Sequence, residues 1–467
     1  MKYTILSVYI LLVTLNCQFL LAQETYTSTE IQEDIAFMEE QLIRFHPNLY
    51  LYSKYDEFNA LTNELKSGVN DITTDIEAYR LLSSYSEIIR DGHTSITPSK
   101  DVFENFQIDT ALLPLRIHWD GELMHSIMDY SEERIIPDGS QLISINGVNT
   151  EDIAANMLTS LQHDGDNTTY PRWILNNFFT AYFYFYYREV EEFNIVYKDV
   201  NGKSNAETIQ ALCKSDISNY RKQRYPEFSK HYQSEKKSGI TLKQLDRESA
   251  ILTIRSFDNG ILLKSYRQRF RSSIRRQLKE VRKNETETLI VDLRGNQGGH
   301  LTNGHFLLKR IMPHPYVMVQ CFTKVNKKCS HSANARNKPT YGPILGLKKP
   351  NKKRYDGKVY FLVDGGSFSC SGIVTHVIKN YSRGIIVGEE TGGSAYSLVG
   401  SPNKKIVLPN TGINVSIPRL QFILQDLRGT EKSGTQPDVM IPVSTEDLLN
   451  NQDSALEYIL EQIELNK

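Results

Sequence analysis

In the part of the chain that follows residue 23, apolar side chains first recur at the spacing of an amphipathic helix. From Thr29 to His46 they fall three or four residues apart, which predicts a helix whose buried face carries Ile31, Ile35, Met38, Leu42 and Phe45. Thr29 and Gln32 fit a capping box at its start, and Pro47 ends it. The same periodicity predicts a second helix over residues 74–89. Residues 24–105 are therefore interpreted as a small helical domain.

Beyond residue 105 the pattern changes to short strands. "LLPLRIHW" and "LMHSIMDY" are strand-like, and "IPDGSQLISINGVNTEDI" reads as a turn, an alternating strand, a tight Asn146-Gly147 turn and a helix that starts at Thr150 or Glu151. Residues 106–210 are thus predicted to be β-rich. The aromatic stretch over residues 170–187 is interpreted as core packing rather than a ligand surface.

The last part of the chain alternates buried strands with helices. "SAILTIRSF", "TLIVDLRGNQGG", "KVYFLVDGG" and "GIIVGEETGG" each carry a strand, and residues 262–283 form a basic helix that we interpret as a solvated face. This predicts a largely parallel sheet flanked by helices, with ligands at the carboxyl ends of the strands. The fold class is therefore an α/β core with two smaller N-terminal domains. The predicted units are 24–105, 106–210, a polar linker over 211–240, the core over 241–450 and a C-terminal helix over 451–467.

Length and charge narrow the class of protein. A chain of 467 residues is too long for one ordinary core, which agrees with several domains. The formal net charge is −1, so no global charge favours nucleic acid or an acidic membrane surface.

The first residues read as an export signal. Lys2 precedes a short apolar run, and Ala22 offers a cleavage point, so residues 1–22 are predicted to be a signal peptide. A retained anchor and a lipoprotein at Cys17 are the alternatives; no other run is long enough to cross a membrane. We expect a periplasmic or extracellular protein. Cys321 and Cys329 then form either a disulfide or two unpaired thiols.

Candidate chemistry starts with the stretch "GGSFSCSG". Ser367, Ser369 and Ser371 follow a predicted strand and stand where a helix begins, and the free N–H groups there stabilise an oxyanion. Serine is also a common helix N-cap, so a structural role stays open. No "GxSxG" elbow is present, which argues against an α/β-hydrolase acting on esters.

A serine hydroxyl needs a general base to become a nucleophile. His93 in "RDGHTS" is distinctive because it lies in a turn at the end of a predicted helix, although such a histidine is often an ordinary surface residue. The glycines of "DLRGNQGG", residues 292–299, force a turn that could supply a second oxyanion donor or be a plain turn. No lysine-serine/threonine pair follows, so a phosphate loop is disfavoured.

Together these segments resemble the S41 peptidases, the tail-specific or C-terminal-processing protease superfamily. "SAILTIRSF", "LIVDLRGNQGG", "SFSCSG" followed by "GIIVGEETGG", and "EKSGTQPDV" occur in the order found in that family. "IPDGSQLISINGV" is similar to the PDZ-like domain that many members carry. The resemblance implies a core of the ClpP-crotonase type and a PDZ-like domain that binds a peptide or gates the cleft.

The family has two catalytic layouts. One pairs the serine with a lysine in the loop that reads "EETGGSAY" here, where Ser394 stands at the lysine position. The other, in the tricorn-core and retinoid-binding-protein-like branch, uses a histidine after the N-terminal helices and a glutamate near the C-terminus. His93 and Glu431 match these positions, and the nucleophile falls on Ser369.

The resemblance further implies two oxyanion donors: the backbone N–H of Cys370 and that of Gly298 or Gly299. Two positions depart from the family pattern. Gly92 replaces a serine beside the histidine, and Gly372 replaces a common glutamate after the nucleophile. The implied function is a serine endopeptidase that needs no cofactor or metal and acts on exported or unfolded polypeptides. The alternative is an inactive relative that binds a peptide or an apolar ligand.

Overall fold

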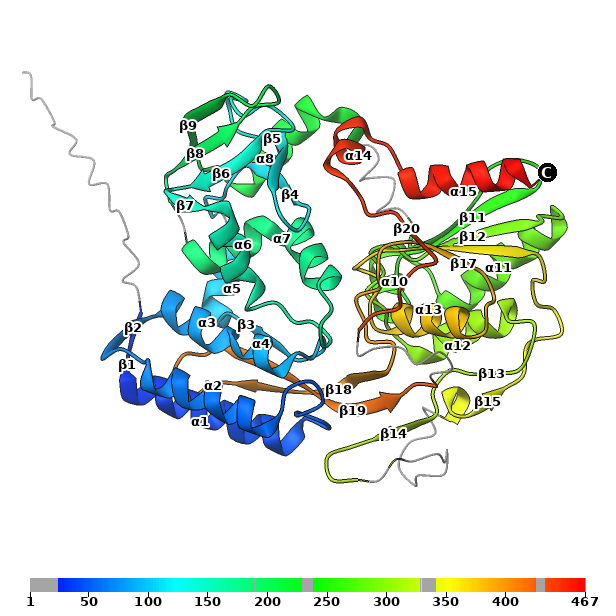
Figure 1. The fold of residues 1–467 in the computed structure, drawn as a ribbon, viewed down its shortest axis with the longest axis horizontal. Coiled ribbons are helices and arrows are strands. Elements are labelled where there is room, and N and C mark those ends of the chain that lie inside the picture. Colours follow the sequence, from blue (N-terminus) through cyan, green and yellow to red (C-terminus); the bar gives the residue numbers. More distant parts are fainter. Residues whose placement is uncertain are drawn as a thin grey trace, which may run out of the picture.

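The fold is mixed α/β, as predicted (Figure 1). The computed structural model describes residues 24–108, 110–188, 190–228, 238–327, 329, 342–425 and 433–466. The expected signal peptide and Glu431 lie outside these residues. Within them, no helix is both long and apolar enough to span a bilayer.

The N-terminal region is helical. It contains α1 (Ser28–Phe45), α2 (Tyr55–Ser67), α3 (Asp75–Ser83), α4 (Tyr85–Ile89) and α5 (Lys100–Gln107), with the short strands β1 (Thr25–Thr27), β2 (Ile72–Thr74) and β3 (Ser95–Thr97). The predicted capping box on Thr29 and Gln32 is wrong, because Thr27 caps α1 and Glu30 completes the box. A glutamate in the first turn also complements the helix dipole, which glutamine does not.

The helix predicted over residues 74–89 is divided into α3 and α4. Ser84 lies at the break, and its hydroxyl donates to the carbonyl of Leu81. Serine side chains compete in this way with the regular helix pattern. Arg90 then ends α4 in the left-handed region, with φ of 52°, and turns the chain into the "DGHT" segment.

Residues 106–210 contain an antiparallel sheet in the order β4-β5-β6-β8-β9. The elements are β4 (Leu115–Trp119), β5 (Met124–Asp129), β6 (Gln141–Ile145), β7 (Val148–Asn149), α6 (Thr150–Leu158), α7 (Thr169–Tyr187), β8 (Glu192–Lys198) and β9 (Ser204–Gln210). Asn146 and Gly147 both have positive φ, as a tight hairpin turn requires. The predicted helix start at Thr150 is confirmed.

One hydrophobic core joins the N-terminal helices to this second region. It includes residues of α1, α3, α6, α7 and the sheet, and it extends to Ile406, Val415 and Ile417 of the long hairpin β18 (Ser397–Val407) and β19 (Asn414–Ile423). The aromatic rings of α7 are largely buried in it, which confirms their interpretation as core. The stretch expected as a linker contains α8 (Lys214–Arg224).

The second half of the chain forms a six-stranded sheet in the order β10-β11-β12-β16-β17-β20. All neighbours are parallel except β10 and β11. The strands are β10 (Ile240–Gln244), β11 (Ser249–Ile254), β12 (Thr288–Asp292), β16 (Lys358–Val363), β17 (Ile385–Gly388) and β20 (Val439–Met440). Buried strands of this kind place their carboxyl ends along one edge, where Ser369 and the glycine loop follow.

Helices cover both faces of this sheet. One face packs against α11 (Phe270–Lys283), α12 (Leu301–Ile311) and α13 (Cys370–Asn380), and the other against α15 (Ser454–Leu465). The basic helix predicted over 262–283 is two helices, because Arg267 adopts a left-handed conformation that ends α10 (Asn259–Tyr266) before α11 begins. The remaining elements are β13 (Tyr316–Val317), β14 (Cys321–Thr323), η1 (Gly342–Ile344), β15 (Leu347–Lys348) and α14 (Thr445–Asn450).

The hairpin β18–β19 connects the two halves of the molecule. Figure 1 shows it below α3 and α4, and β19 also contacts α1; β3 pairs with β19 through Ser95, Ile96 and Thr97. Farther along the same edge, at Gln421–Ile423, β19 pairs with β14, whose Cys321 forms a disulfide with Cys329. The strand that directly follows His93 is therefore bonded to a strand of the second half.

Candidate active site

Ser369 stands at the junction of a buried strand and a helix. β16 ends at Val363, the chain turns through residues 364–369, and α13 begins at Cys370. Ser369 has φ of 56° and ψ of −119°, a conformation that L-residues with a side chain rarely adopt. Its side chain makes no capping hydrogen bond to α13. The strained backbone thus presents the hydroxyl away from the helix, beside the helix's positive end.

The structure separates the three candidate serines. The hydroxyl of Ser367 is buried and donates to the carbonyl of Leu293, at 2.9 Å. The hydroxyl of Ser371 is buried and has no hydrogen-bond partner among the described residues. Ser369 Oγ alone of the three contacts an imidazole.

That imidazole belongs to His93. Its Nε2 lies 3.0 Å from Ser369 Oγ, although the two residues are 276 positions apart in the chain. The ring also stacks on Phe368, with centroids 4.5 Å apart and an angle of 30° between the planes. The residue before the serine therefore fixes the plane in which the histidine lies.

The protonation state of His93 suits a base. Burial lowers the pKa of His93 to about 4, with the charge of Asp91 acting in the opposite direction. At neutral pH the ring is uncharged, so one ring nitrogen carries a lone pair. With Nε2 as the acceptor, Nδ1 carries the proton, and Nδ1 is buried without a hydrogen-bond partner among the described residues.

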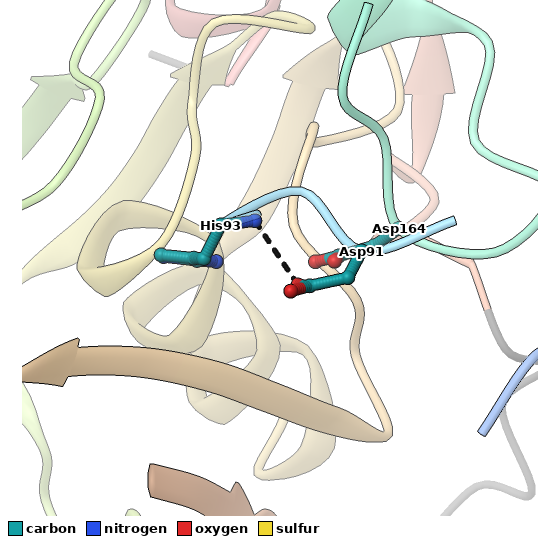
Figure 2. A group of neighbouring side chains, drawn as sticks. All are labelled: Asp91, His93 and Asp164. Atoms are coloured by element: carbon teal, nitrogen blue, oxygen red, sulfur yellow. Dashed lines mark hydrogen bonds between the residues drawn. The ribbon is translucent and has the colours of Figure 1, made fainter. Parts of the chain in front are cut away.

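Two carboxylates lie next to His93. Figure 2 shows Asp91 and Asp164 beside the imidazole, and one nitrogen of the ring lies within 4.8 Å of an oxygen of each. Because Nε2 faces Ser369, the nitrogen on the carboxylate side is Nδ1. Asp91 sits two residues before the histidine, whereas Asp164 comes from the segment between α6 and α7.

The two aspartates are held by different partners. Asp91 accepts hydrogen bonds from His46 Nε2 at 2.9 Å, from the Thr94 hydroxyl at 2.6 Å and from the His93 backbone N–H at 3.0 Å. Burial alone would raise the pKa of Asp91, but the hydrogen bond and charge of His46 hold it below the usual value. Asp91 is therefore ionised and paired.

Among the described residues, Asp164 accepts hydrogen bonds from two backbone N–H groups, that of Gly92 at 2.7 Å and that of Ser394 at 2.9 Å. Burial, and then the charge of Asp91, raise the pKa of Asp164 to about 7. One atom of each of Asp91, His93 and Asp164 lies within 4.8 Å of the other two, so the two carboxyl groups and the imidazole are close neighbours. All four carboxylate oxygens already accept hydrogen bonds, and a proton on Asp164 removes the repulsion between the two charges.

The expected oxyanion donors lie against the serine. Gly298 approaches so closely that a Cβ built on it would be 2.7 Å from the Cys370 nitrogen and 2.8 Å from Ser369 Cβ. The N–H of Gly298 donates to the Asn296 side chain at 2.9 Å. The N–H groups of Cys370 and Gly299 have no hydrogen-bond partner within the described part of the chain. Gly299 is thus the glycine whose donor is available.

A pocket of about 290 Å³ opens beside these groups. His93, Ser369 and Gly299 line it on one side, and its remaining wall includes Leu301, Leu398 and Phe422. The volume is enough for one side chain of a bound molecule. Its apolar wall suits an uncharged group.

Comparison with known proteins identifies the domain that carries Ser369. Residues 248–441 match peptidase family S41. The chain carries an S41 domain. The carboxy-terminal processing protease CtpB of Bacillus subtilis (strain 168) is 22% identical over 183 residues, which are 39% of this chain and 33% of CtpB. The matched segment thus spans about a third of that relative. The predicted S41 resemblance is confirmed over residues 248–441.

Solved structures extend the similarity beyond the S41 domain. Mature CPAF superposes with a TM-score of 0.64 at 14% identity, over 92% of this chain and 95% of CPAF. Mature CPAF complexed with lactacystin gives 0.67 at 13% identity, over 94% and 98%. At such identities the likeness establishes the fold alone. It covers the N-terminal regions as well as the S41 domain.

The sequence analysis missed the residues that attach the N-terminal half to the S41 domain. Tyr170 stacks on the other face of Phe368, with centroids 4.2 Å apart and planes 2° from parallel. Trp173 fills the space against Gly366. These rings were interpreted as core alone. Asp91, within "DGHT", was adjacent to a candidate and could have been weighed, whereas nothing in the sequence marked Asp164.

Proposed function

We propose that the chain is a serine peptidase in which Ser369 is the nucleophile and His93 the general base. The observation that carries the proposal is the 3.0 Å contact between His93 Nε2 and Ser369 Oγ. The neutral imidazole, the helix end and the free N–H groups of Cys370 and Gly299 support it. The match of residues 248–441 to peptidase family S41 supports a polypeptide as the substrate class.

In the first half of the reaction, Ser369 Oγ bonds to the peptide carbonyl carbon while its proton moves to His93 Nε2. The negative charge on the carbonyl oxygen is held by the two N–H groups. The carbon–nitrogen bond then breaks, and the proton on Nε2 passes to the leaving amine. A water molecule repeats the sequence on the acyl-enzyme and regenerates the serine.

Three finer points belong to the same proposal. The family resemblance assigns Glu431 as the carboxylate partner of the imidazolium, and Glu431→Gln tests that assignment. Ser394 stands at the lysine position of the other layout, and its N–H contacts Asp164, which favours the histidine branch. The disulfide between Cys321 and Cys329 supports an exported protein that acts on polypeptides outside the cytoplasm.

Labelling with a fluorophosphonate and hydrolysis of an unfolded protein test the proposal. Wild type should be labelled at Ser369 and should cleave the protein, and Ser369→Ala should lose both. Ser371→Ala is the matched control, since its hydroxyl has no partner among the described residues and should be dispensable. Full activity in Ser369→Ala would overturn the proposal. A wild type that is neither labelled nor active would favour a protein that only binds peptides or apolar ligands.

A further inference from the structure

Asp164 lies where three segments of the chain meet. Its Oδ1 accepts the N–H of Gly92, next to His93, and its Oδ2 accepts the N–H of Ser394 in the S41 domain. Its own segment joins α6 to α7, so the residue ties the histidine turn to the domain that carries Ser369. Its side chain is fully buried, with 1% of the residue exposed.

Within the described residues, the imidazole of His93 has an unpaired nitrogen on the side that faces Asp164. Nδ1 of His93 is buried and has no hydrogen-bond partner among the described residues, which is costly for a donor. The cost rises when Nε2 accepts the serine proton, because the ring then carries a positive charge. A carboxylate facing Nδ1 would stabilise that charge, as in serine triads.

Of the two carboxylates within reach, Asp164 is the less neutralised by its partners once it is ionised. Asp91 is already matched by His46 and the Thr94 hydroxyl. Asp164 has two backbone donors and no cationic partner among the described residues. A new positive charge on His93 therefore gains more from an ionised Asp164 than from Asp91.

We propose that Asp164 is a positioning residue for His93, which stabilises the imidazolium at Nδ1 only after Asp164 has lost its own proton. This rests on the proposed function of His93 as the base. The activity then depends on the ionisation of a residue that never touches the substrate. In the resting enzyme below pH 7 the proton is on Asp164, because a second negative charge beside the ionised Asp91 would be repelled.

The surroundings of the cluster set the direction of the pH dependence. The titratable and charged neighbours are His46 and Tyr52 from the segment after α1, Arg90 beside Asp91, and Tyr170 from α7. The pKa of Asp164 is raised to about 7, so the active, ionised form accumulates as the pH rises through 7. His93 itself is deprotonated throughout this range, since its pKa lies near 4.

The first test is the pH profile of kcat/KM on a fluorogenic peptide. Wild type should gain activity with a midpoint near pH 7. Asp164→Asn should lose this midpoint and, at pH 8, retain about a tenth or less of the wild-type kcat with a nearly unchanged KM. Asp164→Glu should restore part of the activity and a pH midpoint. Asp152→Asn is the matched control: it removes an exposed aspartate in the first turn of the preceding helix α6, and the profile should stay that of wild type.

A second control separates charge from anchoring. Asn167 donates to Glu390 and to the Thr391 carbonyl, so it joins the same two segments without facing His93. Asn167→Ala should keep the midpoint near pH 7 even if its activity is lower. An unchanged midpoint in Asp164→Asn, or its loss in Glu431→Gln alone, would overturn the inference.

The ¹⁵N resonances of His93, assigned by comparison with His93→Gln, provide a readout that needs no turnover. In Ser369→Ala protein the Nδ1 signal should shift near pH 7, as Asp164 ionises, and this shift should vanish with Asp164→Asn. Its absence in a folded protein overturns the inference even if Asp164→Asn fails to fold. If the wild-type protein is inactive but still shows the shift, the peptidase proposal is wrong, whereas the coupling between Asp164 and His93 Nδ1 holds.

Discussion

The two halves of the candidate site are held in place by different means. Ser369 belongs to a strand–turn–helix unit inside the S41 domain, and β16 and α13 fix it through local geometry. His93 lies in a turn between α4 and β3, and three long-range contacts fix it: the stack on Phe368, the pairing of β3 with β19, and Asp164. The nucleophile is thus positioned by its own domain, whereas the base depends on how the halves pack.

This difference teaches that stability and activity need not change together. A variant that disturbs the turn around His93 leaves the six-stranded sheet and its hydrophobic cores intact. A variant in the glycine loop strains the S41 domain itself. The following predictions separate the two halves on that basis.

The largest effect is expected for His93→Gln. Loss of the base should lower kcat roughly 10⁴-fold, the upper end for a general base, because the serine hydroxyl then keeps its proton. The apparent melting temperature should stay near that of wild type, since the ring is held at the junction and not in a core. Peptide turnover and thermal unfolding monitored by circular dichroism measure the two quantities. A large fall in the melting temperature alongside the loss of activity would show that the two halves of the site cannot be separated in this way.

Gly298→Ala should lower both the activity and the stability of the protein. The new Cβ would lie 2.7 Å from the Cys370 nitrogen, and φ of 90° strains any side chain there. We expect kcat to fall about 100-fold, as when an oxyanion donor is displaced, with a loss of about 2 kcal/mol of stability.

Gly295→Ala is the control for strain alone. Gly295 lies in the same loop and also has positive φ, at 66°, but the nearest atom to its Cβ is Trp173 Cζ2 at 3.7 Å. Its stability should drop by about 1 kcal/mol while kcat stays near wild type. If both variants lost activity equally, the close approach of a Cβ at Gly298 to the Cys370 nitrogen would not explain the loss.

The smallest effect is expected for Phe368→Leu, which removes the ring between His93 and Tyr170. Loss of stacking worth about 1 kcal/mol should lower kcat roughly fivefold and leave KM close to wild type. Tyr170→Phe keeps the stack and should remain near full activity. Steady-state kinetics measure both variants. A kcat of Phe368→Leu equal to that of wild type would show that the turn alone orients His93.

Much of the S41 domain could be predicted because its signals are local. Unbroken apolar runs marked β12, β16 and β17, and the hydroxyl-rich turn marked the start of α13 at Cys370. The helix boundaries were less accurate. Ser84 and Arg267 each end a helix through a side-chain hydrogen bond or a left-handed backbone, and the apolar spacing continues across both breaks.

The candidate site was only partly readable from the sequence. Ser369 and His93 were proposed from motifs, and the structure brings them into contact. Asp164 was not, because its relation to His93 is created by packing between distant segments and leaves no pattern along the chain. The preference between Gly298 and Gly299 likewise needed coordinates, since the Asn296 side chain decides which N–H is free.

The pairing of β3 with β19 involves just three residues on β3. Strand partners can shift only in steps of two residues if each side chain is to keep its face, and one such step is about 6.6 Å. A slip of that size would carry the imidazole out of reach of the hydroxyl. The register of one very short strand therefore sets the distance between His93 and Ser369. A peptide that binds along the hairpin and displaces β3 would change that distance.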